Sequence, residues 1–289
     1  MPDTPPGTTE LSASSTGDRV CPICDLPPVP ADRIAELEVN HTNRRHLARQ
    51  SYDLTYCPCG ELIYLSPAPS PPDINSMYAE SDQFRRDTPE SPYRGEHGTA
   101  VLEYTTSRLA SMVRYMGGDF SHRLRVLEVG AGLSWMCRAA KILDWEHLTV
   151  AQDLSDEAVQ ECRWVDHYYV EDVLEQCSVD THGPFDVISM THVFEHLVEP
   201  LAMLRRLAEL LAAPGLIFVT APHRPSGWQR SADVETWRTW SYNHTPAHLQ
   251  YFSRGSFANA AEAAGLAVAF WDDSHEDGQA FEGWLQLIP

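Results

Sequence analysis

One short stretch, "RVLEVGAG" at residues 125–132, constrains this chain more than any other. A run of β-forming residues ends in an acid and two glycines, and a helical pattern begins directly after it. Glycine-rich turns between a strand and a helix let a backbone approach a nucleotide closely. The stretch therefore predicts a nucleotide-type ligand at the end of a buried strand.

Strand and helix patterns alternate after this turn. We predict strands at residues 125–130, 147–153, 166–172, 185–193 and 216–222, and helices at 134–144, 155–164 and 200–215. Such alternation is typical of a mostly parallel sheet with helices on both faces. A further helix is expected at 96–117, before the first of these strands.

The C-terminal part departs from this rhythm. The segment 253–265 predicts a helix with Ser253 or Ser256 as its cap and Gly265 as its stop. Strands are expected at 266–273 and 281–289, joined by a loop without a helix. Two strands joined in this way form a hairpin, so the sheet should carry one antiparallel strand at its edge.

The residues around the glycines narrow the choice of ligand. A dinucleotide fingerprint has a third glycine, and here Trp135 takes its place. Glu128 lies in the strand just before Gly130, where a carboxylate would repel a pyrophosphate and suit a cationic ligand. S-adenosylmethionine (SAM) carries an ammonium and a sulfonium and no phosphate. Asp153 follows the glycines by about 20 residues, at a position where a carboxylate would bind the hydroxyls of a ribose.

Composition excludes several classes of function. The formal net charge of −20 over 289 residues disfavours nucleic acid as a partner. The chain shows neither a secretory signal nor an apolar run long enough to cross a membrane, so a cytoplasmic protein that does not bind membranes is expected. Residues 1–18, rich in Pro, Ser and Thr, are interpreted as a disordered leader.

Seven cysteines without a signal sequence indicate thiols or a metal site more than disulfides. Four of them form two close pairs, Cys21 with Cys24 in "CPIC" and Cys57 with Cys59 in "CPCG". The other three are scattered and are expected to be buried as small apolar groups.

Taken together, "VLEVGAG", "VAQDLS", "FDVISMTHVFEHL" and "HLQYFSRGSF" resemble class I SAM-dependent methyltransferases. "CPIC", the second cysteine pair and "LIYLSPAPSPPDINSMY" resemble a bacterial branch with an N-terminal zinc-binding segment, which includes sugar C-methyltransferases and enzymes of natural-product clusters. The resemblance implies a seven-stranded α/β, Rossmann-like sheet at residues 81–289 and a small zinc-binding module at 19–80.

The resemblance also implies ligand sets. Zinc would be held by Cys21, Cys24, Cys57 and Cys59. Two departures are a serine, Ser134, in the region of the third glycine and a C-x-C second pair where the branch has C-x-x-C. His41 or His46 could replace one cysteine, and the alternative is a cysteine cluster that holds no metal.

The cofactor site follows from the same resemblance. Gly130 and Gly132 would admit the methionine and ribose parts, with Glu128 near the methionine end. Asp153 would accept hydrogen bonds from the ribose hydroxyls, with Leu154 beside it. Asp172 would contact the adenine amino group and Val173 the ring, although Asp172 could equally cap a loop. Thr191 and His192 would face the methyl group.

Methyl transfer needs alignment of donor and acceptor, and a base only where the acceptor carries a proton of high pKa. We expect His192 first and His244 next as that base, oriented by Tyr251. His196 and His248 could be structural, and alignment alone could suffice. An acceptor pocket could be walled by three aromatic residues, which could instead form a small core of their own: Trp228, Trp237 and Trp240.

Three functions remain open at this point. The favoured one is SAM-dependent methylation of a small molecule on carbon, oxygen or nitrogen, in secondary metabolism, by an enzyme of unknown oligomeric state. The second is methylation of a protein or RNA. The third is a SAM-binding or scaffold protein without catalysis.

Overall fold

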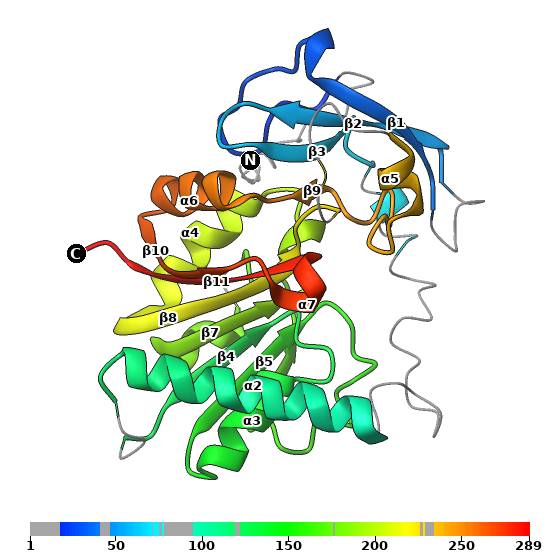
Figure 1. Ribbon diagram of the computed structural model, residues 1–289. Helices are drawn as coiled ribbons and strands as arrows, with labels where there is room; N and C mark the ends of the chain where they lie inside the picture. The colour runs from blue at the N-terminus through cyan, green and yellow to red at the C-terminus, as the bar shows by residue number, and fades with distance from the viewer. Residues whose placement is uncertain are drawn as a thin grey trace, which may run out of the picture.

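Two β-sheets make up the protein, a large one of seven strands and a small N-terminal one of four. Figure 1 shows the small sheet above the large one in a computed structural model. The structure describes residues 18–40, 47–70, 72–74, 77, 95–118, 122–175, 177–225, 228 and 234–289. Almost all of the predicted leader, as well as His41 and His46, lies outside these residues. Within them, no helix is long and apolar enough to cross a membrane.

The large sheet has the strand order β10-β11-β8-β7-β4-β5-β6. Its strands are β4 (Arg125–Val129), β5 (Leu148–Asp153), β6 (His167–Val170), β7 (Phe185–Thr191), β8 (Leu211–Pro222), β10 (Leu266–Asp272) and β11 (Ala280–Leu287). β4 through β8 pair in parallel, and β11 pairs antiparallel with both β8 and β10. The predicted mostly parallel sheet with an antiparallel hairpin at its edge is confirmed, with β10 as the outer strand.

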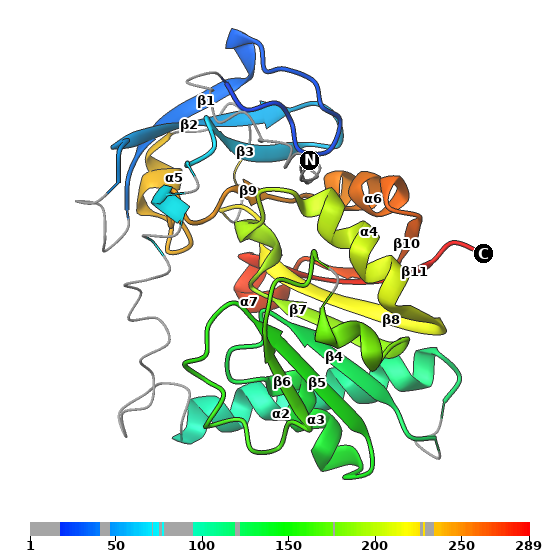
Figure 2. The same cartoon turned by 180° about the vertical axis from the view of Figure 1, so that it is seen from behind.

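Helices cover both faces of this sheet (Figures 1 and 2). α2 (Gly95–Tyr115) and α3 (Trp135–Leu143) pack on one face, through buried residues such as Leu109 and Met136. α4 (Pro200–Leu210) and α6 (Arg254–Ala263) pack on the other, through residues such as Leu204 and Phe257. Because both faces are covered, the inner strands read as continuous apolar runs.

The small sheet joins segments far apart in the chain. β1 (Arg33–Glu38), β2 (Ser51–Cys57) and β3 (Leu62–Ser66) are antiparallel neighbours, and β9 (Gln250–Tyr251) pairs with β3. The core beneath it combines Leu37, Leu54 and Ile63 with Trp237 and Tyr251. The expected module at 19–80 therefore shares its sheet and its core with residues of the C-terminal half.

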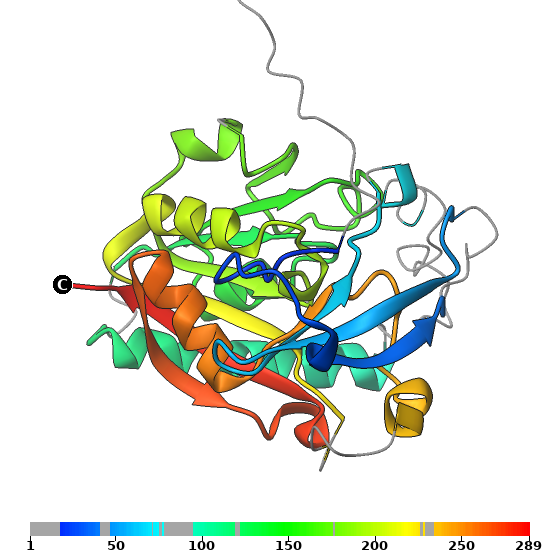
Figure 3. The same ribbon diagram turned by 90° about the horizontal axis from the view of Figure 1, so that it is seen from above.

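The turn between β2 and β3 lies against α6 and contains Gly60. Figure 3 shows the small sheet and α6 from above. Gly60 has φ +98°, and a Cβ there would lie 2.7 Å from the amide nitrogen of Ser256. Ser253, the cap of α6, donates its hydroxyl to the carbonyl of Gly60, and Asn259 Nδ2 donates to the carbonyl of Cys59 at 2.9 Å. Only glycine allows this close approach.

Two expected helices differ in the structure. Residues 155–164 form successive turns, so the predicted helix there is wrong. Its side chains bond to the glycine turn instead: Trp164 Nε1 donates to the carbonyl of Ser134 at 3.1 Å, and the Cys162 thiol to that of Gly132 at 3.5 Å. The predicted helix at 200–215 ends at Leu210, because β8 already begins at Leu211.

Candidate active site

The glycine turn after β4 requires left-handed backbone at three positions. Gly130, Gly132 and Ser134 have φ of 60°, 46° and 55°. A Cβ on Gly130 would lie 2.4 Å from Cγ2 of Val193, in the loop after β7. Gly130 is therefore required both by its conformation and by the close passage of that loop.

Glu128 lies beneath this turn and holds the start of α3. Its Oε2 accepts hydrogen bonds from the Ser134 hydroxyl at 3.0 Å and from the amide of Cys137 at 3.1 Å. Burial raises the pKa of Glu128 to about 7, although the hydrogen bonds from Cys137 and Ser134 act in the opposite direction. The carboxyl group thus performs the capping that the side chain of Ser134 does not.

Asp153 ends β5 and ties the turn to that strand. Its Oδ2 accepts the amide of Gly132 at 2.8 Å, and its Oδ1 accepts that of Ser155 at 3.0 Å. Leu154 follows and is 74% exposed, and Leu174, after β6, is 37% exposed. These apolar side chains, exposed at the ends of adjacent strands, offer a surface that an adenine ring could cover.

The loop after β6 places Asp172 and Val173 in different surroundings. Asp172 is exposed, and its carboxylate accepts the amide of Leu174 at 2.9 Å, as a loop cap does. The side chain of Val173 is buried in the core, and its carbonyl accepts a hydrogen bond from Arg206. A recess lined by Glu171, Asp172, Glu175, Cys177 and Ser178 opens beside them.

At the end of β7, Thr191 is exposed and His192 adopts φ +52°. The His192 ring lies between two carboxylates: Nδ1 is 3.4 Å from Glu195 Oε1 and Nε2 is 3.2 Å from Glu276 Oε1. Burial lowers its pKa, but the pairs with Glu195 and Glu276 outweigh burial and raise it to about 10. The two carboxylates thus favour the protonated ring, and His192 could accept a proton from an acceptor only after it has lost its own.

His244 and Tyr251 lie farther toward the small sheet. His244 is half-buried and its ring centroid lies 4.8 Å from that of His248; burial lowers the pKa of His244. Tyr251 is 1% exposed and donates its hydroxyl to the carbonyl of Tyr242 at 3.4 Å, not to either candidate base. Trp228, Trp237 and Trp240 are buried in the core of the small sheet, which is the alternative weighed for them.

Sequence reasoning missed Glu195, the centre of this region. Its side chain is fully buried, and Nε2 of His196 and of His248 lie 3.8 and 4.0 Å from its Oε1. The available signal was the acid beside the histidine in "FEHL", within a run that is otherwise apolar.

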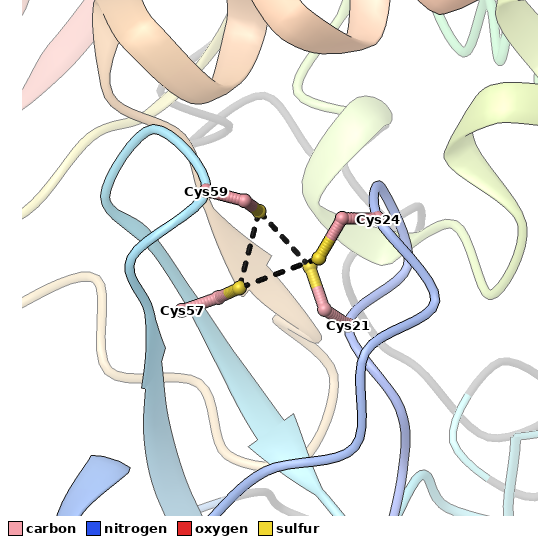
Figure 4. A group of neighbouring side chains, drawn as sticks. All are labelled: Cys21, Cys24, Cys57 and Cys59. Carbon is pink, nitrogen blue, oxygen red and sulfur yellow. Dashed lines mark hydrogen bonds between the residues drawn. The ribbon is translucent and has the colours of Figure 1, made fainter.

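The four paired cysteines converge in the small module (Figure 4). Their thiol sulfurs lie 3.1 Å apart for Cys57–Cys59, 3.5 Å for Cys21–Cys59 and 3.6 Å for Cys24–Cys57. Disulfide sulfurs are about 2.05 Å apart, whereas sulfurs around a tetrahedral zinc ion with 2.3 Å bonds are separated by roughly 3.8 Å. The C-x-C spacing therefore does not prevent a four-sulfur arrangement.

Residues 101–269 match the family described as "Methyltransferase domain", which is more than half of the chain. The chain belongs to this family. The expected class I fold and the expected activity are confirmed together, and the protein is a SAM-dependent methyltransferase.

Relatives of this methyltransferase include the ubiquinone biosynthesis O-methyltransferase of Xanthomonas campestris pv. campestris. The alignment of 176 positions is 28% identical and covers 55% of this chain and 67% of the relative. The plantazolicin methyltransferase BpumL, solved with a pentazolic desmethylPZN analog and SAH, has a TM-score of 0.54 and 13% identity. That likeness covers 75% of this chain and 95% of BpumL, and shows that the methyltransferase shares its fold.

Proposed function

We propose that this methyltransferase transfers the methyl group of SAM to a small-molecule acceptor, on carbon, oxygen or nitrogen, in the biosynthesis of a secondary metabolite. The observation that carries the proposal is the glycine turn, held open by Glu128 from below and by Asp153 from the neighbouring strand. The named products of its relatives, ubiquinone and plantazolicin, support a small acceptor.

The residues of the turn fit SAM. Gly130 and Gly132 carry no side chain where the methionine and ribose parts would lie, and Asp153 would exchange its bond to Gly132 for the ribose hydroxyls. Leu154 presents its exposed side chain to the adenine, with Asp172 and Val173 nearby along the next loop. Bound SAM supplies an electrophilic methyl group on its sulfonium. Glu128 contributes negative charge near the methionine end when it is ionised.

Thr191 and His192 stand at the end of β7, where we place the reacting centre. Their proposed task is to align the acceptor and exclude water, because alignment provides much of the rate in a displacement of this kind. We propose that His192, or else His244, removes the proton of an acceptor that carries one. Tyr251 supports this region through the buried core of the small sheet.

We propose that Cys21, Cys24, Cys57 and Cys59 hold one structural zinc ion, so that the residues from 19 to about 80 form a zinc-binding module on a methyltransferase domain that begins near 81. The sulfur spacings support this, and so does the location of the cluster against α6. We further propose that the enzyme works in the cytoplasm, without membrane or nucleic acid as partner.

Isotope transfer distinguishes the acceptor classes. The protein is incubated with methyl-labelled SAM and a cell extract separated into small-molecule, protein and RNA fractions. Label that appears in the small-molecule fraction supports the proposal, whereas label in protein or RNA contradicts it. A protein of the third class would leave every fraction unlabelled, and calorimetry with SAM then shows whether it binds the cofactor.

A further inference from the structure

A second cluster of metal-type ligands lies apart from the cysteines. Glu195 and His196 come from η4 (Phe194–His196), and His248 comes from the segment before β9. One ligand atom of each of these residues lies within 4.8 Å of the others. Segments about 50 residues apart thus bring a carboxylate and two imidazoles to one point.

The carboxylate at the centre is fully buried, and imidazole rings are the only charged or chargeable groups paired with it among the residues that the structure describes. Glu195 is 0% exposed, and neither of its oxygens accepts a hydrogen bond from the residues that the structure describes. The imidazole nitrogens that face it lie 3.4 to 4.0 Å from its Oε1, longer than a good hydrogen bond. A metal ion held by the carboxylate and the two rings would come closer to these oxygens than the ring nitrogens do.

The two imidazoles are oriented as metal ligands are. Nδ1 of His248 lies 2.9 Å from the carbonyl of Tyr242, and Nδ1 of His196 lies 2.8 Å from that of Ala247. A carbonyl only accepts, so each Nδ1 carries the hydrogen, and the neutral ring then has its lone pair on Nε2. Both Nε2 atoms face Glu195 Oε1. Backbone carbonyls that fix the tautomer in this way are the usual support of metal-binding histidines.

We propose that Glu195, His196 and His248 bind a divalent transition-metal ion as a two-histidine, one-carboxylate set. Ligands at 2.0–2.2 Å from an ion are roughly 3.0–3.5 Å apart, so small side-chain rotations bring the observed spacings into range. The set is closed on the side of Glu195 and His248, whose side chains are 0% and 8% exposed, and opens toward His196 and His192, at 20% and 33%. Open coordination positions are typical of catalytic sites.

The location suggests what the ion does. η4 follows β7 by two residues, so the open side faces the region where Thr191 and His192 would receive the methyl group. An ion there would bind an oxygen or nitrogen of the acceptor and lower the pKa of its proton. This role rests on the proposed methyl transfer, but binding of the ion does not.

Cobalt uptake tests the binding. The full-length protein, purified with zinc in the medium, is dialysed against Co²⁺, and bound cobalt is measured by metal analysis and visible absorption. We expect one cobalt ion per chain with the weak ligand-field bands of nitrogen and oxygen ligands. Cobalt in the cysteine cluster would show thiolate charge-transfer bands. The proposal is overturned if the wild type shows only the thiolate charge-transfer bands, or if it takes up no cobalt.

Variants assign the ligands. We expect His196→Gln and His248→Gln each to weaken cobalt binding at least tenfold. His223→Gln, another buried histidine outside the cluster, serves as the matched control and should bind like the wild type. Wild-type affinity in both cluster variants contradicts the assignment. SAM binding is measured on the same samples: SAM binding without cobalt uptake refutes only the metal site, and cobalt uptake without SAM binding refutes only the proposed function.

Discussion

Glu128 and Asp153 hold the glycine turn from two sides, and both use their carboxylates on backbone amides. A sequence shows that an acid stands next to a glycine turn, but not which atoms it will face. The structure adds a task that precedes ligand binding, which is to keep the turn in its left-handed conformation. Substitutions here should therefore change stability as well as SAM affinity.

The pKa of Glu128 predicts a pH dependence of stability. Because burial raises it in the folded state from 4.5 to about 7, its contribution is fully present below pH 4.5 and is lost as the pH rises through 7. Glu128→Gln keeps an acceptor oxygen and cannot ionise. We expect the wild type to lose about 2–3 kcal/mol relative to this variant between pH 5 and 8. Urea unfolding of both proteins without SAM measures the difference; parallel profiles would contradict it.

Asp153→Ala should weaken SAM binding by about 1.5–3 kcal/mol, the range for hydrogen bonds to a charged group. Asp156→Ala removes an exposed acid from the same loop and should leave affinity unchanged. Calorimetry with SAM gives both values. Equal affinities in the two variants would show that Asp153 serves the turn alone.

His192→Ala and His244→Ala separate a base from a positioning role. A general base contributes roughly 10²–10⁴ in rate, so one of the two should lose that much turnover on an acceptor with a dissociable proton. SAM affinity is measured as the control and should not change. Losses below about tenfold in both would leave alignment as the mechanism.

At the scale of elements, the strands at 125–130 and 147–153 and the tail hairpin were predictable, because their apolar runs and turn residues are local. The helix expected at 155–164 was not formed, since tertiary bonds from Trp164 and Cys162 to the glycine turn replaced helical ones. Glu195 escaped prediction because His248, which completes the cluster around it, comes from a segment about 50 residues away. Local sequence patterns therefore predict the strands of the sheet, whereas the residues that gather at the site depend on contacts between distant segments.

A buried polar cluster fastens α2 to β11. Glu282 is fully buried and accepts hydrogen bonds from the Tyr104 hydroxyl and from Trp284 Nε1, and its Oε2 lies 2.8 Å from Nε of Arg108. Glu282→Ala leaves these donors without their acceptor, so we expect a loss of about 2–4 kcal/mol in the free energy of unfolding. Glu103→Ala, on the same helix, is the control. Denaturant titration compares them, and equal stability would contradict the role of Glu282.

At the scale of the molecule, the cysteine cluster and the small sheet form one unit with α6. Cys59→Ser should cost one zinc ion per chain and lower the melting temperature, because a ligand of the closed site is lost. Cys177→Ser removes a scattered thiol and should retain zinc and stability. Metal analysis and thermal melting decide this, and a metal-free wild type that is fully folded would refute the zinc site.

The small sheet itself could not be predicted in full. Its first three strands lie within residues 33–66, but β9 and the tryptophans that fill its core follow about 180 residues later. The sequence shows that Trp237 and Trp240 lie in one aromatic segment, but it does not show which surface this segment covers. Only the tertiary structure joins the segment to the cysteine module.

The pairing of β3 with β9 has a consequence for synthesis on the ribosome. Ile63 pairs with Tyr251, so β3 leaves the exit tunnel with one edge bare and remains so while nearly two hundred further residues are translated. Bare strand edges attract other chains, and pairings between such distant segments form slowly. The nascent N-terminal strands would therefore depend on chaperones, or on early capture of a metal ion by the cysteines, until the last quarter of the chain arrives to close the sheet.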